Sequence, residues 1–249
     1  MLKNILILFL IVYTALNASA FEDKNAIQFA YGPSTHSLNL NSDAFSASQE
    51  FKQGQGLQIN YSRFTEDGFL KTEIAYRELN NKYLTSTTLM PSEINVKNQE
   101  AEISLLATAA VIDQHKFFRI GLGYAFSKQT ADQTKPNVLV VNNEVQVLEL
   151  KAKYDLYKAN DLVINIGIGL GLPFRYTEYG VQSGVNIKST ELNANIDIQY
   201  YVSTHWSLLA KVQYTSAVTL ADGLGSRGTV NSTEKKQTFF LPIGFSYDF

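Results

Sequence analysis

The last eleven residues of the chain, "FFLPIGFSYDF" (Phe239–Phe249), alternate in character. Counted back from the end, every second side chain is large and apolar or aromatic, while small and polar residues fill most of the places between them. A period of two is the spacing of a β-strand with one apolar face. The sequence therefore predicts a strand over Phe239–Phe249 whose apolar face lies against a non-aqueous surface.

The same alternation recurs nine more times upstream. The predicted strands are Ala26–Gly32, Gly56–Phe64, Phe69–Arg77, Glu100–Ile112, Phe117–Ser127, Gln146–Leu156, Leu162–Tyr176, Thr190–Val202 and Trp206–Thr215. Four of the connections are short, and five are long and polar: Pro33–Gln55, Glu78–Gln99, Lys128–Val145, Thr177–Ser189 and Ser216–Gln237. Short turns at one end and long loops at the other predict an all-β fold, a ten-stranded antiparallel up-and-down transmembrane β-barrel.

Eight or twelve strands are the alternatives to ten. The segment Asn137–Leu150 contains two apolar runs, and the first of them is able to form a separate hairpin above the barrel. The charge is nearly balanced, with 21 Lys and Arg against 23 Asp and Glu, so the sequence has no nucleic-acid footprint. The absence of cysteine excludes a disulfide scaffold and a thiolate metal site.

The N-terminus has the three-part layout of a secretory signal peptide. Lys3 supplies a positive charge, Ile5–Leu16 is an apolar core, and Ala18–Ala20 places small residues before the bond between Ala20 and Phe21. We therefore expect residues 1–20 to be a cleaved signal and residues 21–249 to form a single barrel domain.

The composition of the two faces decides which one meets lipid. The apolar faces of the predicted strands carry no Asp, Glu, Lys or Arg. An Arg or Lys facing lipid would cost about 2–4 kcal/mol at the membrane midplane. The apolar faces are therefore expected to point outward, and the other faces to line the lumen with Lys71, Glu73, Arg77, Glu102, Arg119, Glu149, Lys151, Lys153, Asp155, Arg175, Glu191, Asp197 and Lys211.

The predicted lumen residues are seven basic and six acidic side chains, and this near balance favours internal ion pairs and a hydrated, plugged interior over a pore that selects ions of one charge sign. A narrow, weakly selective pore is the alternative. Outward-facing aromatic residues at both strand ends predict two interfacial girdles. One girdle comprises Tyr31, Tyr76, Phe126, Tyr176 and Tyr214, and the other Tyr61, Tyr154, Tyr200, Tyr247 and Trp206.

The terminal strand also resembles the C-terminal signature of bacterial outer-membrane β-barrel proteins, the porin-like superfamily. Phe249, Tyr247, Phe245 and Ile243 match that signature. The resemblance implies that the protein lies in an outer membrane among lipid and lipopolysaccharide. It also implies that both termini are periplasmic and that the long loops are extracellular. It also implies that periplasmic chaperones and the barrel-assembly machinery handle the chain. Pro173 and Pro242 depart from a regular strand, and we expect an irregularity at each.

Three functions follow as hypotheses. The first is a non-enzymatic protein without a cofactor, either a narrow porin-like channel or a plugged structural barrel. The second is a surface adhesin or ligand-binding barrel that acts through its long loops. The third is a rim enzyme, either similar to the omptin proteases, with His36 near Asp43 or Asp222, or lipid A-modifying, with "HWS" (His205–Ser207). His36, His115 and His205 do not cluster, so no metal site is expected.

Overall fold

The computed structural model describes residues 25–41, 46–65, 69–85, 92–113, 116–131, 142–158, 161–178, 186–224 and 230–249. The predicted signal segment and its cleavage position between Ala20 and Phe21 lie outside these residues, as does the first apolar run of Asn137–Leu150. In the described part of the chain there is no helix long and apolar enough to span a membrane.

The described residues form eleven stretches of strand in one sheet. They are β1 (Asn25–Asn41), β2 (Ser46–Phe64), β3 (Leu70–Thr85), β4 (Ser92–Asp113), β5 (Lys116–Ala131), β6 (Asn143–Lys158), β7 (Leu162–Glu178), β8 (Asn186–Tyr201), β9 (Trp206–Leu224), β10 (Val230–Phe240) and β11 (Ile243–Asp248). Each strand pairs antiparallel with its neighbours in sequence, and β10 and β11 are two parts of one strand. The fold is therefore a ten-stranded up-and-down barrel, as predicted.

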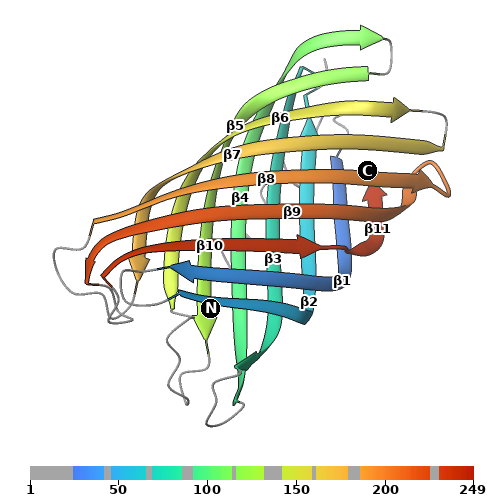
Figure 1. Ribbon diagram of the computed structural model, residues 1–249. Coiled ribbons are helices and arrows are strands. Elements are labelled where there is room, and N and C mark those ends of the chain that lie inside the picture. The colour runs from blue at the N-terminus through green and yellow to red at the C-terminus, as the bar shows by residue number, and fades with distance from the viewer. Residues whose placement is uncertain are drawn as a thin grey trace.

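The barrel closes between its first and last strands (Figure 1). β1 pairs with β10 and β11 on one side and with β2 on the other. At the seam, Asn25 N donates to Phe249 O at 3.0 Å, and Phe249 N donates to Asn25 O at 2.9 Å. An open sheet edge is not stable in lipid, because each unpaired backbone group costs several kcal/mol. The terminal strand satisfies this requirement by pairing on both sides.

Both prolines interrupt the ladder, as expected. β10 and β11 are separated at Leu241 and Pro242, but hydrogen bonds continue there on both sides: Leu241 N donates to Pro33 O at 3.0 Å across the seam, and Pro242 O accepts from Lys211 N of β9 at 2.9 Å. At the other proline, Val147 pairs with Pro173 and Gln146 pairs with Arg175, so Phe174 is an extra residue on β7. Such a bulge shifts the alternation of faces by one position.

The long polar connections of the sequence prediction are wrong in extent, because most of their residues are strand. β1 and β2 together continue through most of Pro33–Gln55, and β4 begins at Ser92 rather than at Glu100. The backbone ladder continues because pairing requires only extended backbone, whereas the apolar outer face ends where lipid ends. We call these continuations the extension: residues 33–41, 46–56, 78–85, 92–100, 127–131, 142–146, 175–178, 186–191, 216–224 and 230–238.

The remainder of the barrel, which we call the belt, has the predicted polarity. Large apolar side chains project from its outer face and are exposed, among them Ile103, Leu105, Leu122, Leu148, Leu150, Leu170, Leu208 and Ile243. All six alternate residues of the terminal stretch face outward as well, and Phe240, between two of them, is fully buried inside. Around Trp206, the ring centroids of Tyr247 and Phe245 lie 4.8 and 5.9 Å away.

The extension differs from the belt on both faces. On β1, residues 34, 36, 38 and 40 are buried, and Leu38 and Leu40 are among them, while Thr35 and Asn41 are exposed. Leu79 and Val96 are buried in the same way on β3 and β4. A Cβ added to Gly56 would collide with its ladder partner Leu79 and with the ring of Phe240 on β10, so these two side chains fill the space above this glycine. The extension therefore has a polar exterior, and its interior combines apolar side chains with buried polar ones such as Asn81, Glu234 and Thr238.

Candidate functional site: the lumen

The interior of the belt contains a cavity of about 1430 Å³. Its lining includes Thr65, Asp161 and Thr204, so it reaches the end of the barrel where the short connections lie. A second cavity, of about 90 Å³, lies in the extension and is lined by Asn98, Gln129 and Tyr176 among others. The lumen is thus divided into a large polar chamber and a small one.

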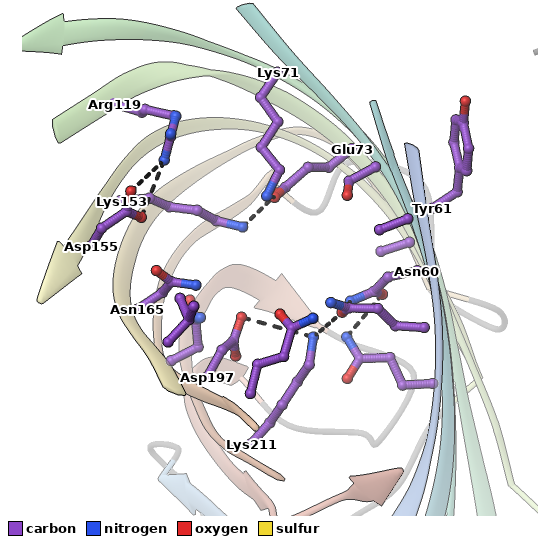
Figure 2. A pocket seen from close by; sticks show the side chains of 18 of the residues that line it. Asn60, Tyr61, Lys71, Glu73, Arg119, Lys153, Asp155, Asn165, Asp197 and Lys211 are labelled. Carbon is purple, nitrogen blue, oxygen red and sulfur yellow. Dashed lines mark hydrogen bonds and ion pairs between the residues drawn. The ribbon is translucent and has the colours of Figure 1, made fainter. Parts of the chain in front are cut away.

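Ion pairs bridge the wall of the large chamber. Glu73 accepts from Lys71 at 2.7 Å and from Lys153 at 2.5 Å. Arg119 Nη1 lies 3.2 Å from both carboxylate oxygens of Asp155. Figure 2 shows these side chains pointing into the same space from β3, β5 and β6. Each cation of this group therefore has a carboxylate partner, which offsets the cost of removing its charge from water.

Lys211 occupies the opposite side of the chamber. Its Nζ lies 3.8 Å from Asp197 Oδ2 and donates to Gln28 Oε1 at 2.8 Å. Asn60 contributes its side-chain oxygen at 2.9 Å from the same Nζ when its amide is oriented to suit the neighbouring groups. The amides extend the polar network across the seam from β9 to β1 and β2 (Figure 2).

A second charged layer lies between the two cavities. Arg77 Nη2 lies 2.6 Å from Glu100 Oε2, and both residues line the two cavities. Lys151 pairs with Glu102 and, at 3.1 Å, with Glu149. We call these five residues the partition. Asn193 joins the partition to β8, since its Nδ2 donates to Glu149 at 2.5 Å and to Glu191 at 3.0 Å.

Most of the predicted lumen residues lie where the sequence placed them. Ten of the thirteen line the large cavity: Lys71, Glu73, Arg77, Glu102, Arg119, Lys151, Lys153, Asp155, Asp197 and Lys211. Glu191 lines the small cavity, and Glu149 is buried within the partition.

The prediction for Arg175 is wrong. Its ladder partner is Gln146, it is exposed, and it lines neither cavity, because the bulge at Phe174 reverses the faces beyond it. For the same reason Tyr176 is not part of the outer girdle: it faces the lumen, where Asn143 Nδ2 donates to its hydroxyl at 3.3 Å. Phe174 is the exposed aromatic residue at that strand end.

Several polar residues of the interior are absent from the sequence prediction, among them Glu100, Gln58 and Lys236. Glu100 begins a predicted strand and lies two residues from Glu102, and so on the same face. Gln58 accepts from Gln213 Nε2 at 2.9 Å. Lys236 falls in a predicted loop, and its Nζ donates to Gln129 at 2.6 Å and to Asn98 at 3.1 Å.

Two of the three histidines, His36 and His205, belong to the described residues. His36 is buried, and its Nδ1 is 2.8 Å from Thr238 Oγ1. Asp43 and His115 lie outside the described residues, as does the side chain of Asp222. His205 is exposed beside Thr204 and stacks on Tyr247, and Trp206 begins β9. Among the described residues, no group of three or more His, Asp or Glu side chains is arranged to hold a metal ion.

Solved structures with this architecture are bacterial outer-membrane proteins. The outer membrane protease OmpT from Escherichia coli is 9% identical with a TM-score of 0.60, and the match covers 92% of this chain and 97% of that chain. The protein has the fold of a bacterial outer-membrane β-barrel. No protein-family model matches the sequence, and no curated protein matches it either.

Two further matches are more distant. The translocator domain of the autotransporter NalP from Neisseria meningitidis is 13% identical with a TM-score of 0.44, and the match covers 96% of this chain and 92% of that chain. Ail, the attachment invasion locus protein of Yersinia pestis, is 10% identical with a TM-score of 0.35, covering 92% of this chain and all of that chain. At such identities the likeness describes the fold alone.

Proposed function

We propose that this protein is a non-enzymatic, integral barrel of the bacterial outer membrane whose lumen is closed to solutes. The observation that carries the proposal is the partition. Arg77 and Glu100 separate the large chamber from the small one, and the buried side chains of Leu38, Leu40 and Val96 fill interior space in the extension. A conducting pore needs a continuous polar path, and here ion pairs and apolar packing interrupt it.

The proposed orientation places the short connections and the seam residues Asn25 and Phe249 at the periplasmic side, and the extension outside the cell. The difference between the outer faces of the two regions supports this arrangement. The belt has the exposed apolar face that lipid requires, whereas the extension has the polar exterior that water requires. The nine residues of β1 in the extension correspond to about 30 Å of strand.

Biogenesis partners belong to the same proposal. Ile243, Phe245, Tyr247 and Phe249 all project outward from the last strand, and Ile243 is 71% exposed. A row of apolar and aromatic side chains on one strand offers a recognition surface to the barrel-assembly machinery and to periplasmic chaperones.

A second candidate function is surface binding through the extension and its connections. The observation that favours it is the projecting polar wall, which would display the connections on a paired, hydrogen-bonded support rather than on long loops. Shortening the connection between β3 and β4 would abolish adhesion to a ligand without unfolding the barrel. The rim-enzyme alternative has less support, because His36 is buried against Thr238.

Conductance in a planar bilayer tests the proposal. The protein is first refolded in detergent, and folding is checked by heat-modifiable migration on a gel. The folded protein should insert without discrete conductance steps. Reproducible steps that change when Lys151 or Glu191 is substituted would overturn the closed-lumen proposal and restore the porin-like alternative.

A further inference from the structure

The backbone ladder between β7 and β8 stops before either strand ends. The two strands pair with each other as far as Gly171 and Glu191. Beyond that pair, β7 continues to Glu178 and pairs only with β6, and residues 186–190 of β8 pair only with β9. Within the described part of the chain, the facing edges of these two segments therefore have no backbone partner. We call the space between them the gap.

Two residues of β7 favour this early end of the ladder. Pro173 has no N–H to donate to a neighbouring strand. Phe174 is the extra residue of the bulge, and a bulge bends its strand and increases the local twist. Residues 186–190 of β8 contain no proline and pair with β9 without a shift of register, so they form the more regular of the two edges.

One cation lies on each side of the gap, at the same height. Phe174 has no partner on β6, so Arg175 lies three ladder pairs above Gly171. Lys188 lies three residues beyond Glu191 on β8, and both cations are exposed on the outer face. If the ladder continued, Arg175 and Lys188 would be direct cross-strand neighbours, and like charges in that arrangement are destabilising.

The nearby carboxylates do not lie between these cations. Glu178 is on the inner face of β7 with Tyr176, whose hydroxyl donates to it at 3.3 Å. Glu144 is on the outer face of β6, on the far side of β7 from the gap, and Lys128 Nζ donates to its Oε1 at 2.8 Å. Among the described residues that border the gap on the outer face, none is acidic.

The inner side of the gap meets the small chamber. Tyr176 on β7 and Ser189 on β8 both line this chamber, whose volume is about 90 Å³. It has room for a small side chain but not for a large one. Side chains of a strand alternate between its two faces. A strand lying along the gap would therefore need acidic residues on its outer face and small residues on its inner face.

We propose that the gap binds an extended, acidic segment of a partner protein, which pairs its backbone with the free edge of β8 and places a carboxylate between Lys188 and Arg175. Strand addition supplies backbone hydrogen bonds, and the alternate side chains supply specificity. A second copy of this chain is the less suitable occupant, because it would bring like charges together, and lysine on an edge opposes such self-pairing. The inference rests on the proposed exposure of the extension outside the cell.

Peptide binding with matched variants tests the gap. The full-length protein is refolded in a non-ionic detergent and titrated into a short, fluorescent, end-capped peptide of alternating glutamate and threonine, and binding is followed by anisotropy. At about fivefold for each lost cation, Arg175→Gln/Lys188→Gln should weaken binding about 25-fold. Lys82→Gln/Lys97→Gln removes two outer-face cations from β3 and β4 and should change binding by less than about twofold.

The same peptide with glutamine in place of glutamate measures the role of the carboxylate, and it should bind clearly more weakly. Equal binding of the acidic and neutral peptides, or equal losses in the two double variants, would overturn the inference.

Methylated peptides separate strand addition from simple attraction between charges. Methyl groups on alternate backbone nitrogens block one edge of a strand and leave its other edge free. Of two acidic peptides methylated on opposite edges, at least one should bind about tenfold more weakly than the unmethylated peptide, because it loses backbone hydrogen bonds to β8. If both bind as well as the unmethylated peptide, the attraction is ionic only and the inference fails.

Insertion into phosphatidylcholine vesicles separates this inference from the function on which it rests. If the protein inserts but binds no peptide, the proposed membrane location stands and the strand site fails. If the protein does not insert into any vesicle, the proposed function itself fails.

Discussion

The belt and the extension are built from the same ten strands, yet their outer faces differ in polarity. In the belt, Leu122 projects outward with 68% of its surface exposed, while the ion pairs of Glu73 and Arg119 lie inside. In the extension, Leu40 is fully buried inside, and Asn41 beside it is exposed. One hydrogen-bonded ladder therefore runs through both regions. The outward side chains differ, being apolar in the belt and polar in the extension.

The largest difference is expected between two adjacent phenylalanines at the border of the two regions. Phe240 is fully buried in the interior, and Phe239 is 48% exposed on the outer face. Phe240→Ala should lower the free energy of unfolding by about 3–5 kcal/mol, because it leaves a cavity in a packed interior. Phe239→Ala should cost clearly less, because lipid fills the space of the lost ring. Urea unfolding in vesicles, followed by Trp206 fluorescence, measures both, and equal costs would remove the distinction between the regions.

A charge placed on the outer face should give the second-largest difference in the free energy of unfolding between the two regions. Leu122→Arg places a cation where we propose lipid, at a cost of about 2–4 kcal/mol. Asn80→Arg places the same cation on the exposed face of the extension and should change the free energy of unfolding by less than about 0.5 kcal/mol. Leu122→Ala controls for the lost leucine. The assignment of the outer faces fails if both arginines are tolerated alike in the same unfolding assay.

Ion pairs inside and outside the barrel should differ by a smaller amount. Arg77 and Glu100 in the partition point into the lumen, whereas the Lys97–Glu78 pair lies on the outer face. Double-mutant cycles with alanine should give a coupling energy of about 1–3 kcal/mol for the partition pair. The outer pair should give about 1 kcal/mol or less. An outer coupling as strong as the inner one would show that the partition is no drier than the surface.

Single substitutions at the bulge of β7 should have the smallest effect on stability. They should still differ clearly in how accessible the new side chain is to a reagent in water. The chain contains no cysteine, so a single introduced cysteine is the only thiol that a maleimide can label. Arg175→Cys and Tyr176→Cys should each leave the barrel folded. A membrane-impermeant maleimide should label position 175 rapidly and position 176 slowly, because the bulge turns Arg175 outward and Tyr176 inward. The reverse order would return Arg175 to the lumen.

The sequence predicts the belt well because one face of each belt strand is apolar and carries no charged residue. Strict alternation with an uncharged face, as at Leu148 and Leu150 around Glu149, fixes both the strand and its direction. The extension lacked such a signal. Its segment "HSLNLN" (His36–Asn41) also alternates, but with Ser and Asn on the outer positions it looks like a polar loop.

Register changes limited the prediction of the lumen. Pattern alone placed Arg175 on the inner face because it continues the odd-numbered positions of Gly167, Gly169 and Gly171. Pro173 predicts an irregularity, but the direction of the next side chains depends on which residue of β7 is left unpaired, and the pairing with β6 decides that. The pairing of Arg77 with Glu100 was equally out of reach, since it depends on the register between β3 and β4.

The seam also sets the order of folding events. Ala26 pairs with Asp248 and Tyr31 with Ile243, so the contacts that close the barrel join almost the two ends of the described chain. All the other strand pairs join neighbours in sequence and are able to form as hairpins. Closure is therefore the contact with the greatest sequence separation and carries the largest loop-closure entropy. We expect it to be the late, rate-limiting step, with a curved, open sheet as the species that precedes it.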